Sequence, residues 1–201
     1  MGHGLGKTPE FIIIKNRASG AWYAGHIGLG SDVWTAGKHL VLNDTAAVGT
    51  NANILWGSGT VDEKVFSVGG WDTVNRSGNK YIAYCWTGVE GFSNFGKYEA
   101  NGNANGPFVY LGFKPALVII KNMDGGSTNW MIWDNKRGPF NSNSTILRGN
   151  ATDAENTGTW YIDMVSNGFK IRTGGSDMIN NNQTHVYMAW AEMPFKYATA
   201  K

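Results

Sequence analysis

Short apolar runs rich in β-branched and aromatic residues recur along the chain, and clusters of glycine, asparagine, serine and aspartate separate them. Apolar positions at helical spacing are nearly absent. This pattern is typical of strands joined by turns, so we predict an all-β chain. The expected strands are 11–16, 21–26, 39–43, 64–68, 81–87, 95–99, 107–111, 117–122, 130–134, 144–148, 160–165, 168–173 and 185–192.

One of these runs occurs twice. "LGKTPEFIIIKN", Leu5–Asn16, returns as "LGFKPALVIIKN", Leu111–Asn122, at an offset of 111 − 5 = 106. Two further sets of residues recur in the same order at offsets between 103 and 105: Phe66, Gly69, Gly70, Asp72 with Phe169, Gly174, Gly175, Asp177; and Ile82, Cys85, Trp86 with Val186, Ala189, Trp190. Self-similarity at a fixed spacing predicts a repeated architecture.

We therefore interpret the chain as a tandem duplication of a unit of about 100 residues. Each unit holds enough expected strands for a small antiparallel β-sandwich, of the jelly-roll or concanavalin-like type. The predicted units are residues 1–94 and 95–201, closely packed. A sequence rich in asparagine and glycine joins them, but strands flank it, so we expect an ordered connection.

Composition and charge exclude several classes of protein. The net charge is +2, and no basic block is longer than the Lys136–Arg137 pair, so we expect no nucleic-acid partner. Apolar runs of about four residues are far too short to cross a bilayer, so we expect no membrane insertion. A single cysteine, Cys85, excludes an intrachain disulfide or a cysteine zinc cluster, and its apolar setting predicts a buried, inert thiol.

Catalytic patterns are missing. A glycosidase needs two carboxylates facing across a cleft, but the acidic residues are mostly isolated or stand in turn-like sequence. No Gly-x-Ser-x-Gly elbow occurs, and the histidines carry no nucleophile signature. Spaced histidine or cysteine pairs and an Asp-x-Asp-x-Asp calcium loop are also missing. We predict no enzymatic activity, no metal site and no cofactor.

Aromatic residues give the better candidate site. Nine tryptophans occur in 201 residues, and their rings can stack on sugar rings as well as fill a core. We expect those inside strands, Trp86, Trp130, Trp133 and Trp190, to be core.

Trp34 and Trp71 lie in polar, glycine-rich sequence, where either an exposed binding surface or folding back onto the core is possible. Arg76 follows Trp71 closely. Lys136 and Arg137 fit contact with an acidic surface glycan, contact with a neighbouring subunit, or an ordinary solvated turn. These five residues form the predicted ligand-binding set.

Three stretches, "GPFVYLGFKPALVIIK", "FKIRTGG" and "HVYMAWAEMPFK", resemble a module that recurs in tail-fibre and other virion proteins of marine bacteriophages. The resemblance covers essentially the whole chain in two copies. It implies a location in the phage particle after synthesis in the bacterial host cytoplasm. It also implies a non-enzymatic adsorption or structural role, with a host-surface glycan, other virion proteins or further copies of the chain as partners. The alternatives are a purely structural capsid or fibre-assembly module and a polysaccharide depolymerase.

The two ends of the chain carry the last expectations. In the resembling group the first copy opens with an extra strand that this sequence lacks, which suggests a trimmed chain. The segment Phe195–Ala200 resembles the start of "FGKYEANG" at Phe95–Gly102. We expect this segment to form a strand that completes the sheet of the first unit, in the same chain or in a neighbouring copy.

Overall fold

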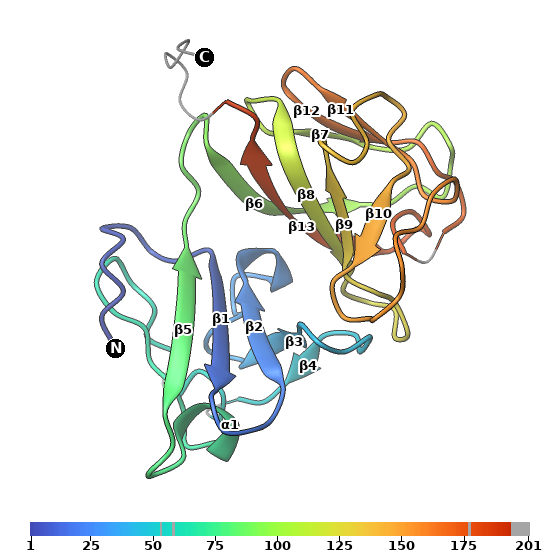
Figure 1. The fold of residues 1–201 in the computed structure, drawn as a ribbon. Helices are drawn as coiled ribbons and strands as arrows, with labels where there is room; N and C mark the ends of the chain where they lie inside the picture. The colour runs from blue at the N-terminus through green and yellow to red at the C-terminus, as the bar shows by residue number, and fades with distance from the viewer. Residues whose placement is uncertain (53, 58, 177, 194–201) are drawn as a thin grey trace. The chain divides into compact units, whose positions relative to one another are not determined.

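The computed structural model describes residues 1–52, 54–57, 59–176 and 178–193. The chain divides into two compact units, Met1–Thr87 and Gly88–Lys201, which are described separately here. Thirteen strands form three sheets, every strand pair is antiparallel, and only two helices of three and four residues occur in the described ranges (Figure 1). The all-β antiparallel prediction is confirmed.

The first unit has one five-stranded sheet, ordered β4-β3-β2-β1-β5. Its strands are β1 (Phe11–Asn16), β2 (Trp22–His26), β3 (Lys38–Val41), β4 (Gly49–Thr50) and β5 (Tyr81–Trp86). Between them lie the helical turn η1 (Ile27–Leu29) and the short helix α1 (Asp72–Asn75).

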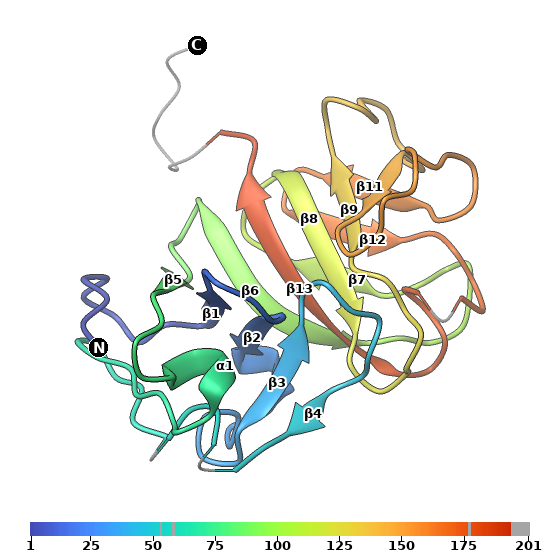
Figure 2. The same cartoon turned by 60° about the horizontal axis from the view of Figure 1, so that its bottom comes forward.

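Alternate residues of β1 enter the core, because successive side chains of a strand face opposite sides of its sheet. Ile12 and Ile14 point into this core and are almost completely buried. The segment between β4 and β5 covers this face with Leu55, Trp56, Phe66 and Val74, the last of which lies on α1 (Figure 2). The cover is therefore loops and one helical turn, and the strand expected at 64–68 is reduced to isolated bridges.

The second unit has two sheets with a shared core. The five-stranded sheet, ordered β10-β9-β8-β13-β6, consists of β6 (Ser93–Glu99), β8 (Pro115–Asn122), β9 (Met131–Asp134), β10 (Ile146–Arg148) and β13 (Thr184–Ala191). The three-stranded sheet, ordered β11-β12-β7, consists of β7 (Phe108–Tyr110), β11 (Ile162–Val165) and β12 (Gly168–Ile171). Figure 1 shows the two sheets as separate layers. Trp133 and Ile120 from one sheet and Phe169 and Ile171 from the other are completely buried in the shared core.

The hairpin β11–β12 confirms one prediction and corrects its detail. The sequence favours a type I′ turn centred on Asn167 and Gly168. The observed register pairs Val165 with Gly168, so the loop is Ser166 and Asn167, and neither residue has a positive φ. Gly168 instead starts β12, where a Cβ would stand 2.0 Å from the carbonyl oxygen of Val109. Close approach of β7, rather than turn geometry, explains this glycine.

Corresponding strand pairs of the two units share their register. Phe11 lies opposite Trp86 in the β1–β5 ladder, and Leu117 lies opposite Trp190 in the β8–β13 ladder. These positions differ by 117 − 11 = 106 and 190 − 86 = 104 residues, which are the offsets of the sequence repeat. The orders β3-β2-β1-β5 and β10-β9-β8-β13 also correspond strand by strand.

Three expectations about individual segments need separate comment. The expected boundary between the units lies between residues 94 and 95, whereas the observed division follows Thr87, because β6 pairs with β13 of the second unit. No helix in the described ranges is long and apolar enough to span a membrane. The terminal strand expected at 195–200 lies outside the described residues.

Candidate functional site

A surface pocket of about 510 Å³ lies at one end of the second unit's large sheet. β8 begins there and its antiparallel neighbours β9 and β13 end there, so the loops that extend these strands meet around the pocket. The pocket is lined by residues of these loops and one residue of β11: Lys114, Asn135, Lys136, Gly138, Pro139, Phe140, Asn141, Met164 and Glu192. Most of the lining therefore comes from the loop between β9 and β10.

Asp134, the last residue of β9, fixes the start of this loop. Its Oδ1 accepts backbone N–H bonds from Lys136 at 2.9 Å and from Arg137 at 2.8 Å. Its Oδ2 pairs with the guanidinium of Arg137. Asn143 then donates to the carbonyl oxygen of Asp134 at 2.9 Å and closes the loop, and a Cβ at Gly138 would clash with this asparagine.

Asn141 fixes the far side of the same loop. Its Oδ1 accepts from the backbone N–H of Met164 at 2.9 Å, and its Nδ2 donates to the carbonyl oxygen of Met164 at 3.1 Å. The neighbouring Ser142 hydroxyl donates to Asp163 at 2.6 Å. Phe140, directly before Asn141, is 82% exposed. An exposed aromatic ring is thus held on a loop that is anchored on both sides.

The charges around the pocket are mostly paired. Lys114 and Glu192 form an ion pair at 2.7 Å, and both line the pocket. Burial tends to raise the pKa of Asp134, but hydrogen bonds from the backbone and guanidinium of Arg137 and from the backbone of Lys136 outweigh it, and the pKa lies below its usual value. The exposed ammonium of Lys136 makes no ion pair with any described residue.

The lining offers an apolar surface and polar groups that a sugar ring can contact. Phe140 offers an apolar ring face, and Asn135 and Lys136 offer polar groups beside it. Among the described lining residues Glu192 is the single carboxylate, whereas glycoside hydrolysis uses two facing carboxyl groups. In the described part of the chain no cluster of three or more histidine, cysteine or acidic residues is arranged to hold a metal ion.

Two of the predicted binding residues lie in this loop. Lys136 lines the pocket, as a ligand-binding role requires. Arg137 does not line it, because its guanidinium pairs with Asp134 at 2.5 Å and lies 3.9 Å from Glu155. Arg137 therefore positions the loop, and a direct contact with a ligand would require it to leave these partners.

The two predicted tryptophans belong to the first unit and are half-buried. Trp34 meets the fully buried Trp56 edge-on, with ring centroids 5.1 Å apart, and covers Gly25, where a Cβ would come within 2.3 Å of the Trp34 ring. Trp71 packs on Tyr23 at 5.0 Å. Both rings lie against the first unit's core, which is the second of the two arrangements that the sequence left open.

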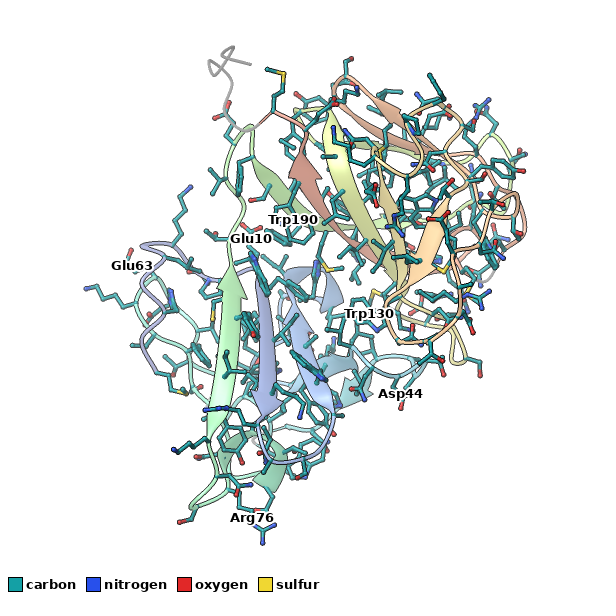
Figure 3. All side chains as sticks on the ribbon, in the orientation of Figure 1. Glu10, Asp44, Glu63, Arg76, Trp130 and Trp190 are labelled. Atoms are coloured by element: carbon teal, nitrogen blue, oxygen red, sulfur yellow. The ribbon has the colours of Figure 1, made fainter. Side chains whose placement is uncertain are left out.

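Arg76 follows α1 and projects from the end of the first unit (Figure 3). Its side chain is 63% exposed and lies 3.7 Å from Asp72, one helical turn earlier. The structure thus brings Lys136 and Arg137 into one loop of the second unit, whereas Trp34, Trp71 and Arg76 belong to the first unit.

Sequence reasoning missed Phe140. No binding residue was predicted between Arg137 and the next expected strand, 144–148. A phenylalanine between proline and asparagine in the polar sequence "RGPFNSNS" is the signal that was present. Two further aromatic residues, Phe108 and Tyr110, are exposed on the outer face of β7, and Val109 between them is buried.

Other expected positions can also be compared. Trp130 and Trp133 are completely buried, which confirms them as core, whereas Trp86 and Trp190 are half-buried. Cys85 is half-buried as well, and burial raises the pKa of its thiol to about 11. A thiol with such a pKa is almost entirely protonated at neutral pH and therefore a weak nucleophile.

Comparisons with known proteins give a family but no function. A family model described as "Domain of unknown function (DUF7483)" matches residues 1–194. No curated protein and no solved structure matches the chain.

Proposed function

We propose that this chain, which belongs to the family described as "Domain of unknown function (DUF7483)", is a non-enzymatic module of a bacteriophage tail fibre or related appendage that binds a glycan of the host surface. The observation that carries the proposal is the pocket beside Phe140. An exposed aromatic ring on an anchored loop, with amide and ammonium groups next to it, is the arrangement that a sugar ring needs for stacking and hydrogen bonding.

The location in the virion is part of the proposal and comes from the sequence. It rests on the resemblance of "GPFVYLGFKPALVIIK" and "HVYMAWAEMPFK" to modules of marine phage virion proteins. An all-β fold with anchored loops suits this environment, since the loops at one end of a sheet can vary without disturbing the core.

The tandem arrangement of two homologous jelly-roll units is also proposed. The shared strand order and register support duplication of at least the four central strands of each unit. The covering layers differ, because a three-stranded sheet covers the second unit and loops with α1 cover the first. Duplication followed by divergence of the cover explains both observations.

A purely structural role in capsid or fibre assembly is the second candidate. Phe108 and Tyr110 are 47% and 67% exposed on the outer face of the three-stranded sheet. Exposed aromatic residues on a sheet face favour packing against another subunit over enclosure of a small ligand. In that case host glycans are not bound, and Phe108 and Tyr110 are covered in the virion.

A glycan array probed with the intact chain and three variants tests the proposal. Phe140→Ala removes the ring, Lys136→Ala removes the ammonium, and Tyr110→Ala is the control for loss of an exposed aromatic residue elsewhere in the unit. We expect wild type and Tyr110→Ala to retain the same glycans, whereas Phe140→Ala loses them and Lys136→Ala is weakened most for acidic glycans. Absence of any retained glycan with folded wild type, or equal retention by Phe140→Ala, contradicts the glycan-binding role.

A further inference from the structure

The first unit's sheet has an uncovered edge at β5. β5 is the last strand in the order β4-β3-β2-β1-β5, whereas the corresponding strand β13 lies between β8 and β6. The β1–β5 and β8–β13 ladders also end in equivalent hydrogen bonds. In the first the N–H of Arg17 donates to the carbonyl oxygen of Lys80 at 2.9 Å, and in the second the N–H of Met123 donates to that of Thr184 at 3.1 Å. The two edges are therefore equivalent, but only that of β13 is covered by a described strand.

The backbone groups along this edge are directed away from β1. The carbonyl oxygens of Lys80 and Trp86 accept bonds at the β1 side. Because backbone groups alternate along an antiparallel strand, those of Tyr81, Ala83 and Cys85 point to the other edge. No described strand pairs with them there.

β5 also lacks the usual protection of an edge strand. Charged residues and prolines normally prevent edge-to-edge pairing, but the sequence of β5 is "YIAYCW". Its exposed face carries Ile82 and Tyr84, which are 39% and 41% exposed. Such an edge favours the addition of a further strand.

The covering of β13 indicates which segment to expect on β5. β13 is covered by β6, the strand that follows β5 in the chain, so the segment after one unit pairs with the sheet of the next unit. The segment that follows β13 contains Lys196 and Tyr197, which repeat the Lys97–Tyr98 pair of β6. We propose that residues 195–200 of one copy of this chain pair antiparallel with β5 of a second copy.

An exchange of side-chain size supports this pairing. In the second unit Gly96 of β6 lies opposite Tyr187 of β13, and a Cβ at Gly96 would stand 2.6 Å from the Tyr187 hydroxyl. Ala83 of β5 corresponds to Tyr187 of β13, at an offset of 187 − 83 = 104. The phenylalanine at position 195 corresponds to Gly96 of β6, at an offset of 195 − 96 = 99. A small residue opposite a large one is thus replaced by a large residue opposite a small one.

The donor segment follows the second unit in the chain and the acceptor edge belongs to the first unit, so each contact joins two different surfaces and each copy can bind two others. Association through it gives open chains, rings or, where two copies exchange the segment reciprocally, closed dimers. This inference does not depend on glycan binding, because the acceptor strand β5 belongs to the first unit and does not line the pocket of the second unit.

Two variants separate the donor from the acceptor. Ala83→Pro removes an outward N–H while it leaves the β1 ladder intact, and a truncation that ends at Met193 removes the donor. We expect wild type to grow in mass over about a hundredfold range of concentration in sedimentation velocity. Each variant alone should remain monomeric, and an equimolar mixture of the two should form a species with the mass of two copies.

Controls keep this test decisive. If Ala83→Pro loses its circular dichroism signal, Tyr84→Lys takes its place in the mixture. Leu147→Lys, on the edge strand β10, is the matched control for the effect of a new charge on an edge strand. The proposal is overturned if wild type stays monomeric over the whole range or if the mixture does not associate. It is also overturned if the truncated chain melts earlier than a monomeric wild type, because the segment then closes its own chain.

Discussion

The backbone N–H of Trp130 donates a 2.8 Å hydrogen bond to Oδ1 of Asn150, and in the other unit the backbone N–H of Trp22 donates to Oδ1 of Asn43 at the same distance. Asn150 follows β10 and holds the residue before the neighbouring strand β9, and Asn43 follows β3 and holds the first residue of the neighbouring strand β2. The repeated side-chain bond supports the proposed duplication of the two sheets.

Replacement of either asparagine by alanine should destabilise its own unit. Asn150→Ala leaves the part-buried Trp130 N–H without its acceptor and should lower the free energy of unfolding by about 1–3 kcal/mol. Asn43→Ala should cost less, about 0.5–1.5 kcal/mol, because its bond is exposed and water can replace the asparagine. Chemical denaturation monitored by tryptophan fluorescence measures both. Asn75→Ala, at an exposed position of α1, is the control and should change stability by less than about 0.5 kcal/mol. Equal stability of all three variants would argue against a structural role of the repeated bond.

The buried His39 should make stability depend on pH. Burial lowers the pKa of His39, and its hydrogen bond to the carbonyl oxygen of Gly37 opposes the shift only in part. The unfolded chain therefore binds a proton at this residue before the folded chain does. Its contribution to stability is fully present above the unfolded pKa, about 6.5, and is lost as pH falls below that value.

Comparison of wild type with His39→Gln isolates this contribution from those of the other histidines. The free energy of unfolding of wild type should fall more steeply between about pH 7 and pH 5 than that of His39→Gln. Parallel pH profiles of the two proteins would show that His39 titrates alike in the folded and unfolded chains.

Asp134 should show its effect at lower pH. Its pKa is below the usual value, so its contribution to stability is present above the unfolded pKa of about 3.9 and is lost as pH falls through the folded pKa. Asp134→Asn should reduce the acid sensitivity of the second unit. It should also increase hydrogen exchange at the amides of Lys136 and Arg137, which donate to its carboxylate. Unchanged exchange at these two amides would mean that the loop is held by other contacts.

Phe140 should matter for binding and not for folding. Its ring is 82% exposed, so Phe140→Ala should change the free energy of unfolding by less than about 0.5 kcal/mol. Trp133→Ala, in the same unit, removes a completely buried ring and should cost about 3–5 kcal/mol. A large loss of stability in Phe140→Ala would indicate that the ring packs within the protein, which its exposure contradicts.

The sequence predicted most strands but not the cover of the first unit. Strand 11–16 agrees with β1 at both ends, because its β-branched run is bounded by polar residues. The run 64–68 is also rich in β-branched and aromatic residues, yet it forms only isolated bridges while Phe66 fills the core. Composition indicates that a residue is buried against a sheet, but it does not specify whether the backbone joins a ladder.

The site was harder to predict than the fold. Lys136 was identified from its place in a polar turn, and Phe140, four residues later, was missed because phenylalanine is normally assigned to a core. For Trp34 and Trp71 the sequence left both exposure and packing on the core open, and both half-buried rings lie against the first unit's core. Exposure of a single aromatic side chain depends on contacts from distant segments, such as that of Trp34 with Trp56.

Competition for adsorption tests the central claim most directly. For the proposed phage module, host cells are incubated with saturating purified chain and then challenged with phage particles whose virions contain it by immunodetection, and unadsorbed phage are counted. The adsorption role predicts that wild type slows adsorption, that Tyr110→Ala does so equally, and that Phe140→Ala does not. Unchanged adsorption in the presence of saturating, folded wild type would contradict the account.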